Sequence, residues 1–399
     1  MAKNSAIQRI LPLGVQDFPN IRRLGIVYVD KTARVYELIT GSEKMFFLSR
    51  PRQFGKSLLC TTLEAIFEGR RELFGEIAGR PALAINNLDW EWKRHPVIRI
   101  DLFAGNYGTG TAVLNDVLQH DLDNTARLYG VTLRGKTVPA IFKNLIADLH
   151  ERFNEKTVVI IDEYDKPLNT TLGKRDVHVE LRNTLRTFYG VIGSCDTHLR
   201  FVLLTGLSTF SYKSIFSDLK LTDLTFNPRY ADLGGLTLVE METNFGPEID
   251  CILKKTGCSR EEYIDKLHRR YNGYRLSKDP LTVYNPLGLI RHIYDAEERS
   301  THWCSGCPTM PSFLAELIKT HKVGTLDPSD MQVRTMDFST YDIDNIAQAP
   351  LLYQTGNLTI SDYIAETDTY TLDFPNNEVR TSFTETLVKH NAGAADDGQ

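Results

Sequence analysis

The stretch from Met45 to Leu59 reads MFFLSRPRQFGKSLL, and it joins a short apolar run to the start of an amphipathic segment. Its Gly55-Lys56-Ser57 ending matches the phosphate-loop pattern G-x-x-x-x-G-K-[ST], except that Arg50 stands where the first glycine is expected. Such a loop works through backbone N–H groups at a strand-to-helix turn. Gly55 is retained where the chain would come closest to phosphate. Arg50 therefore does not exclude a nucleotide site.

The same pattern assigns roles within the loop. Lys56 would reach the β- and γ-phosphates, and the Ser57 hydroxyl would bind Mg²⁺. The alternative is a surface turn in which these residues occur together by chance. The predicted nucleotide-binding residues are Arg50, Pro51, Arg52, Gln53, Phe54, Gly55, Lys56, Ser57 and Leu58.

A second motif favours the nucleotide site. Residues 158–161 are four apolar residues, and Asp162 and Glu163 follow them directly. A carboxylate at the end of a buried strand is costly unless it has a partner or a role. In P-loop enzymes the first acid holds Mg²⁺ and the glutamate polarises the attacking water. We therefore predict Ser57 and Asp162 as metal ligands, and Glu163 and Lys56 as catalytic residues; ordinary surface acids are the alternative.

A third element is the apolar run 201–204, which Thr205 follows directly. Ligands of open α/β sheets bind at the carboxyl ends of the strands. Thr205, together with Ser208, could orient the attacking water or sense the γ-phosphate, and it is the third predicted catalytic residue. A threonine that only forms a turn is the alternative.

Composition limits the classes of protein that remain possible. The 399 residues are 42% hydrophobic and 24% charged with a net charge of −5, which indicates a globular chain without a general nucleic-acid footprint. No apolar run approaches the roughly 20 residues that span a bilayer, and no signal peptide is evident, so a cytoplasmic protein is expected. The spacing of Cys304 and Cys307 is half of a zinc motif, without a second pair.

Outward from the loop, apolar runs alternate with amphipathic stretches, which predicts an α/β fold of the P-loop NTPase type with a central parallel five-stranded sheet. The expected strands are 45–48, 97–102, 157–161, 200–204 and 224–226. The expected helices are 56–67, 138–153 and 177–192.

From about residue 236 capped helices dominate, and Thr237-Leu-Val-Glu240 and Ser259-Arg-Glu-Glu262 both fit the capping box. Short strands are expected at 351–353, 357–360 and 370–372. We predict a P-loop ATPase domain over 1–235, a mainly helical domain with a winged-helix-like part over 236–385, and a disordered tail over 386–399.

The chain resembles the AAA-ATPase-like family of bacterial proteins, which is related to the archaeal and STAND-type ATPases. In members of this family the phosphate loop also tends to read R-P-R-x-F-G-K-S. The resemblance covers nearly the whole chain through Gly14-Val-Gln-Asp17-Phe18, Tyr28-Val-Asp30-Lys31-Thr32, Ile161-Asp-Glu-Tyr-Asp165-Lys-Pro167, Phe188-Tyr-Gly190, Thr205-Gly206, Tyr271-Asn-Gly-Tyr274, Tyr284-Asn-Pro286, Thr355-Gly356 and Phe374-Pro-Asn376.

Two departures from the family pattern matter. Gln53 stands where arginine is common, which removes a cation near the phosphates. Family members often carry a C-terminal nuclease-like domain of the PD-(D/E)XK class, and the few residues after Arg380 are not expected to contain it. Arg50 and Arg52 have two open roles, because their guanidinium groups could contact phosphate in cis or pair with nearby acids.

These observations predict an ATP-binding, Mg²⁺-dependent, slow ATP hydrolase that acts as a conformational switch. One alternative is a nucleotide-binding scaffold that barely hydrolyses ATP, with a protein partner or a nuclease effector. The other is an ATPase that contacts nucleic acid through the basic and aromatic run 266–275, which could equally be a solvated helix end.

Overall fold

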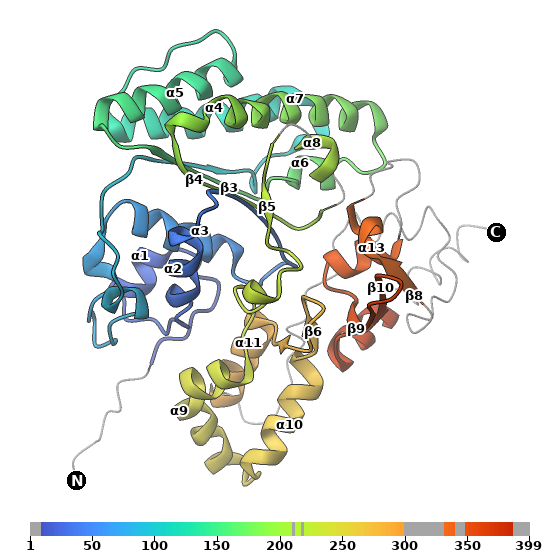
Figure 1. Ribbon diagram of the computed structural model, residues 1–399. Coiled ribbons are helices and arrows are strands. Elements are labelled where there is room, and N and C mark those ends of the chain that lie inside the picture. The colour runs from blue at the N-terminus through green and yellow to red at the C-terminus, as the bar shows by residue number, and fades with distance from the viewer. Residues whose placement is uncertain (1–8, 210–211, 217–218, 299–330, 340–347, 386–399) are drawn as a thin grey trace, which may run out of the picture.

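The computed structural model describes residues 9–209, 212–216, 219–298, 331–339 and 348–385. Its centre is a five-stranded parallel sheet with the strand order β2-β3-β4-β1-β5 (Figure 1). The expected α/β fold with a parallel five-stranded sheet is confirmed. The strands are β1 Met45–Ser49, β2 Val97–Asp101, β3 Thr157–Asp162, β4 Leu199–Gly206 and β5 Thr222–Asp223.

Helices cover both faces of this sheet and make three layers (Figure 1). Alternate strand side chains point to opposite faces, so Phe46 packs in one core and Phe47 in the other. The core on the Phe46 side is shared with α1 Phe18–Arg23, α2 Thr32–Thr40 and α3 Lys56–Phe67; the other is shared with α4 Thr111–Tyr129, α5 Val138–Phe153 and α7 Arg175–Ser194.

The predicted fifth strand is wrong in position. Residues 224–226 were expected to form it, but β5 is Thr222–Asp223. The Asp223 carboxylate accepts a hydrogen bond from the Thr225 backbone N–H at 2.8 Å, which is the geometry of a turn. This turn takes the chain out of the sheet immediately after the two paired residues.

The strand register brings three loops to one edge of the sheet. Strand β4 lies between β1 and β3, with Leu48 paired to Thr205 and Ile161 paired to Leu204. All these strands are parallel, so their carboxyl ends meet at the same edge. The loop after β1 and the acids at the end of β3 therefore flank Thr205.

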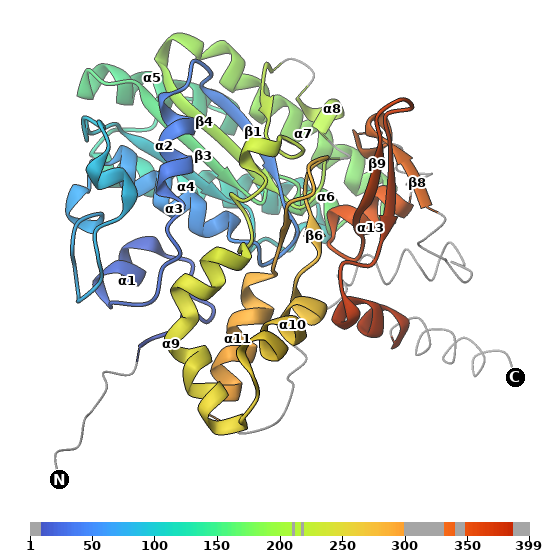
Figure 2. The same cartoon turned by 60° about the horizontal axis from the view of Figure 1, so that its bottom comes forward.

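A helical part follows the sheet. It contains α9 Leu238–Thr256, α10 Arg260–Tyr271 and α11 Pro286–Glu298, which bury a shared apolar core (Figure 2). Thr237 and Glu240 form the complete capping box that was predicted. Ser259 caps α10 through the Glu262 backbone N–H. A short hairpin of β6 Tyr274–Arg275 and β7 Thr282–Val283 connects α10 to α11.

Towards the end of the described residues lies a three-stranded antiparallel sheet beside helix α13 Gln348–Gln354, and a helical segment over 377–385 follows the sheet (Figure 2). Its strands are β8 Met331–Arg334, β9 Thr359–Ile364 and β10 Thr369–Asp373. The strand predicted at 351–353 is wrong, because these residues lie inside α13. A three-residue apolar run fits a helix or a strand equally well, and Pro350 is tolerated in a first helical turn.

The winged-helix-like arrangement is not confirmed among the described residues. The Cys304 and Cys307 pair and the predicted tail 386–399 lie outside them. No helix in the described part of the chain has the length and apolar character needed to cross a membrane.

Candidate functional site

The phosphate loop runs from the end of β1 to the start of α3. Gly55 is the residue before α3 and adopts the left-handed conformation with φ 83°. A Cβ atom at this position would meet no heavy atom within 4 Å, so the backbone conformation, and not crowding, requires glycine here. Gln53 is also left-handed, with φ 68°. The loop therefore has the strand-turn-helix context that the motif requires.

Lys56 is buried and lies across the loop. Its Nζ donates to the carbonyl oxygens of Arg50 and Pro51 at 3.1 and 3.2 Å. The same ammonium lies 3.4 Å from Glu163 Oε1. The structure therefore brings together the lysine of the loop and the second acid of the β3 motif, as their predicted roles require.

Asp162 is fully buried at the end of β3. Its Oδ1 accepts hydrogen bonds from the Thr205 hydroxyl at 2.5 Å and from the Glu163 backbone N–H at 3.1 Å. Its Oδ2 is buried without a hydrogen-bond partner among the described residues. A buried carboxylate oxygen without a donor is an acceptor suited to a cation or to its bound water.

This oxygen is the observation that fits Mg²⁺. The described residues contain no group of three or more His, Cys, Asp or Glu side chains that could hold a metal. Mg²⁺ needs no such group, because it keeps several waters and binds through one or two protein oxygens plus substrate phosphates. The predicted pair of Ser57 and Asp162 is a donor set of that kind.

Glu163 has two unusual properties. Its backbone is left-handed with φ 53°, which is uncommon for a residue other than glycine and marks many functional positions. Burial raises the pKa of its carboxyl, and the Lys56 ammonium opposes this rise. A carboxyl with a raised pKa can still act as a base near neutral pH.

Thr205 lies between the two motifs, and its hydroxyl is bound to Asp162. This contact makes it a positioning group for the carboxylate, with Cys60 Sγ 3.9 Å away on the α3 side. Ser208, which was weighed for the same role, donates its hydroxyl to Asp165 at 2.5 Å instead.

Asp165 was not predicted as a site residue. It is fully buried and accepts hydrogen bonds from the Leu207 N–H, the Ser208 N–H and hydroxyl, and the Asn169 amide. These contacts join the loop after β3 to the end of β4. A third acid so soon after a buried strand, in the run Asp162-Glu-Tyr-Asp165, is the sequence signal that could have identified it.

The Arg50 side chain is engaged with backbone groups, and its contact with phosphate stays a prediction. The guanidinium is buried and donates to the carbonyl oxygens of Ser49, Thr225 and Tyr230, each at 2.9 Å. It has no ion pair within the described part of the chain. Burial lowers its pKa to about 10. Arg50 therefore anchors the loop to the chain after β5.

We expect Arg50→Met to lower the free energy of unfolding by about 2–4 kcal/mol, because buried carbonyl groups would lose their donor. Chemical denaturation monitored by circular dichroism measures this loss. Arg52→Met is the matched control, since no hydrogen bond of the Arg52 side chain occurs among the described residues. Equal stability of the two variants would contradict the anchoring role.

The other side of the loop is held by the later parts of the chain. Phe54 is buried and packs edge-on against Tyr274, with ring centroids 4.8 Å apart. Leu276 and Val283 belong to the same small core. Gly356 lies so close that a Cβ atom there would be 2.9 Å from Pro51 Cβ. The loop is thus in contact with both the helical part and the C-terminal sheet.

An apolar pocket of about 100 Å³ lies directly beside the loop. Gly55 and Leu58 line this pocket, which lies between the N-terminal segment and the helical part. Other lining residues are Tyr28, Val29, Leu236 and Ile290. Its position next to the phosphate loop and its apolar walls suit a flat aromatic ring.

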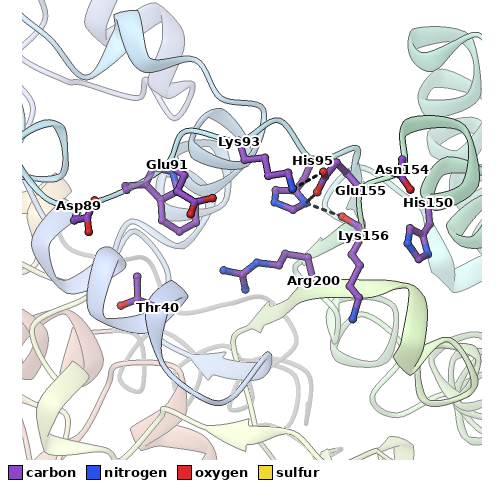
Figure 3. A pocket seen from close by; sticks show the side chains of 11 residues that line it. Thr40, Asp89, Glu91, Lys93, His95, His150, Asn154, Glu155, Lys156 and Arg200 are labelled. Carbon is purple, nitrogen blue, oxygen red and sulfur yellow. Dashed lines mark hydrogen bonds and ion pairs between the residues drawn. The ribbon is translucent and has the colours of Figure 1, made fainter.

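A larger polar pocket of about 700 Å³ lies at the opposite edge of the sheet (Figure 3). Lys93 pairs there with Glu155 at 2.6 Å, and His95 Nδ1 lies 2.9 Å from the Lys156 carbonyl oxygen. Arg200 at the start of β4 also lines it. Because ligands of open parallel sheets bind at the carboxyl ends of the strands, this pocket is not the candidate nucleotide site.

The basic run 266–275 is largely engaged with other groups. Lys266 pairs with Glu262 at 2.6 Å, Arg269 with Asp265 at 2.5 Å, and Arg270 with Glu378 at 2.7 Å. Such pairs are typical of a solvated helix end. Contact with nucleic acid through this run stays a prediction.

The chain is similar to a known protein family and to two individual proteins. The family described as "Predicted AAA-ATPase" matches residues 12–216. An "Uncharacterized protein in vnfD 5'region" from Azotobacter chroococcum mcd 1 is 34% identical over 385 residues, which are 95% of this chain and 70% of that protein. The match to the Aeropyrum pernix ORC2 protein, whose structure was solved as ADPNP-ADP complexes, covers 90% of this chain and 92% of that protein. The two sequences are 13% identical. The TM-score of this match is 0.30.

Proposed function

This chain belongs to the AAA-ATPase-like family and carries an ATPase-type nucleotide-binding module, and on that premise we propose that it binds ATP with Mg²⁺ and hydrolyses it slowly. One observation carries the proposal. The Lys56 ammonium of the phosphate loop lies 3.4 Å from Glu163, next to the buried Asp162 at the carboxyl edge of the sheet. A lysine that can bind phosphate and a carboxylate that can accept a proton from water are therefore adjacent.

The predicted catalytic and metal-binding residues each have a role in the proposed reaction. Backbone N–H groups around Gly55 hold the phosphates, and Lys56 adds a cation. Glu163 accepts a proton from the attacking water, while Thr205 keeps Asp162 in position. Ser57 and Asp162 would hold Mg²⁺, which when bound would screen the charge of the phosphates.

The apolar pocket beside the loop is proposed to take the adenine base. We expect Leu58→Trp, which fills this small pocket, to weaken ATP binding by about tenfold because the base loses its apolar contacts. Binding of inorganic tripolyphosphate should stay unchanged. Leu58→Met conserves the volume and is the control. Titration calorimetry with both ligands measures the difference, and an equal loss for both would contradict the base pocket.

We propose that the nucleotide controls the arrangement of the domain over 1–235 relative to that over 236–385. Phe54 and Pro51 of the loop touch Tyr274 and Gly356 of the later parts, so a change in the loop would be transmitted directly. Small-angle scattering with ATP and with ADP tests the switch. Identical profiles would reject it, whatever the rate of hydrolysis.

The turnover assay separates this proposal from the scaffold alternative. Phosphate release from ATP in the presence of Mg²⁺ supports the hydrolase. Tight nucleotide binding without release supports a scaffold that serves a protein partner or a nuclease effector. Nucleotide set free by denaturing the purified protein gives an independent readout, because retained ADP indicates hydrolysis followed by slow exchange.

A further inference from the structure

Asp165 is a fully buried carboxylate in the loop after β3, and the proposed reaction does not use it. Its Oδ1 accepts a hydrogen bond from the Leu207 N–H at 3.1 Å. Its Oδ2 accepts from the Ser208 N–H at 2.7 Å, the Ser208 hydroxyl at 2.5 Å and the Asn169 amide at 2.8 Å. Both oxygens are thus bound by protein donors, in contrast to Asp162. Asp165 has the contacts of a group that holds two segments together.

Glu163 has a backbone conformation that needs such support. Its φ of 53° is left-handed, which costs free energy for a residue other than glycine and persists only where the surroundings fix it. The Glu163 N–H donates to Asp162 Oδ1 at 3.1 Å, and its carbonyl oxygen accepts from the Lys166 N–H at 2.9 Å. These bonds lie within the turn and move with it. Contacts to another element must therefore fix the turn in place.

The end of β4 supplies these contacts on both sides of Glu163. Before it, Asp162 accepts a hydrogen bond from the Thr205 hydroxyl at 2.5 Å. After it, the Tyr164 N–H donates to the Thr205 carbonyl oxygen at 2.9 Å, and the Tyr164 hydroxyl donates to the Ser208 carbonyl oxygen at 2.8 Å. The residues that flank Glu163 are thus bonded to one short segment of the chain.

The two segments touch directly at Gly206. A Cβ atom at this position would lie 2.5 Å from Asp165 Oδ1 and would also collide with the Tyr164 ring. Glycine therefore permits the close approach that brings Asp165 within reach of the N–H groups of Leu207 and Ser208. Hydrogen bonds from N–H groups to a carboxylate are stronger than those between neutral groups. The Asp165 carboxylate can thus hold the turn against the strain at Glu163.

We propose that Asp165 is a positioning residue, which fixes the turn after β3 to the end of β4 and so keeps Glu163 directed at the attacking water. The proposal rests on the proposed ATPase function and deepens it. In this arrangement Glu163 Oε1 lies 3.4 Å from Lys56 Nζ of the phosphate loop. A misplacement of about 1 Å can lower a rate by about 10²-fold, whereas a shift of the base leaves the phosphate contacts of the loop intact. Asp165 should therefore influence turnover and not nucleotide affinity.

The test compares Asp165→Asn with the wild type. Asparagine keeps the shape, but its NH₂ group replaces one acceptor oxygen and would face a donor of Leu207 or Ser208. We expect kcat to fall by about tenfold, and the affinity for ATP to change by less than about twofold. Ile146→Val removes a buried methyl group from the core on α5. It is the control for a general loss of stability and should leave kcat unchanged.

A double variant shows whether Asp165 acts through Glu163. In the Glu163→Gln protein the base is already absent, so the addition of Asp165→Asn should lower the residual single-turnover rate by less than about twofold. A residue that only maintains the fold would lower the rate by the same factor in both backgrounds. Ser208→Ala removes one donor to Asp165 and should show the same pattern with a smaller effect. It tests the inference if Asp165→Asn does not fold.

Hydrogen exchange gives a readout that does not depend on activity. Peptides that contain residues 163–168 and 205–208 should exchange faster in Asp165→Asn than in the wild type, because the junction between these segments is weakened. Peptides from α5 should exchange at the same rate in both proteins.

Three outcomes would overturn the inference. They are an unchanged kcat in a folded Asp165→Asn protein, an equal fall of the rate in both backgrounds, or unchanged exchange in both segments. If the wild type releases no phosphate from ATP, the proposed hydrolase fails, and the exchange measurement alone decides whether Asp165 holds the turn. A wild type that hydrolyses ATP, with an Asp165→Asn protein that behaves identically, removes only the role of Asp165.

Discussion

Glu163→Gln should bind ATP normally and hydrolyse it more slowly by a factor on the order of 10² or more. Glutamine keeps the shape of the side chain and most of its hydrogen bonding, but it cannot accept a proton from the attacking water. The Lys56 ammonium 3.4 Å away would lose its ion pair, and this loss does not reduce the attraction of that ammonium for phosphate. Phosphate release and nucleotide titration, measured on the same preparation, separate the two effects.

The same residue predicts how the rate depends on pH. Glu163 must be ionised to act as the base, and burial raises its pKa above the ordinary value for glutamate. The ratio kcat/KM should therefore fall as the pH is lowered through this raised pKa, at a higher pH than an ordinary glutamate would give. Glu163→Gln should lack this acid limb.

Two results would contradict the assignment of Glu163. One is a wild-type rate of hydrolysis in the Glu163→Gln protein, and the other is an acid limb that persists in it. Asp123→Asn is a matched control on the exposed surface of α4, far from the loop in sequence, and it should leave both the rate and the pH profile unchanged.

Lys56→Ala should weaken ATP binding by about tenfold to a hundredfold. One charge-assisted contact to phosphate is worth about 1.5–3 kcal/mol, and about 1.4 kcal/mol corresponds to a factor of ten. The change also leaves Glu163 without its nearest cation, so its carboxyl would bind a proton more readily. Titration calorimetry with ATP and Mg²⁺ measures the affinity.

The control for this variant is Lys136→Ala, because Lys136 is exposed and lies in the segment before α5. Circular dichroism should give the same helix content for both variants and the wild type. Unchanged ATP affinity in a folded Lys56→Ala protein would remove the phosphate-loop assignment and, with it, the proposed function.

Local patterns in the sequence were sufficient for much of the fold. The helix expected at 56–67 and the strand expected at 157–161 follow from runs of adjacent residues, and the structure has α3 at Lys56–Phe67 and β3 at Thr157–Asp162. The capping box of Thr237 and Glu240 is equally local. The local pattern predicted the wrong element at residues 351–353, because a short apolar run is compatible with either a helix or a strand.

The sequence by itself determined the strand-turn-helix around Gly55 and the strand that ends in Asp162, because each depends on residues that are neighbours in the chain. The alternation of apolar runs with helices indicated a parallel sheet, but the order β2-β3-β4-β1-β5 pairs strands that are distant in the chain. Only the tertiary structure decided which polar groups meet. Arg50 binds the carbonyl groups of Thr225 and Tyr230, and Thr205 binds Asp162. These partners are distant in the chain, and a buried donor takes whichever acceptor the packed elements bring within reach. A hydrogen-bond partner is therefore a property of the packing, which no local pattern contains.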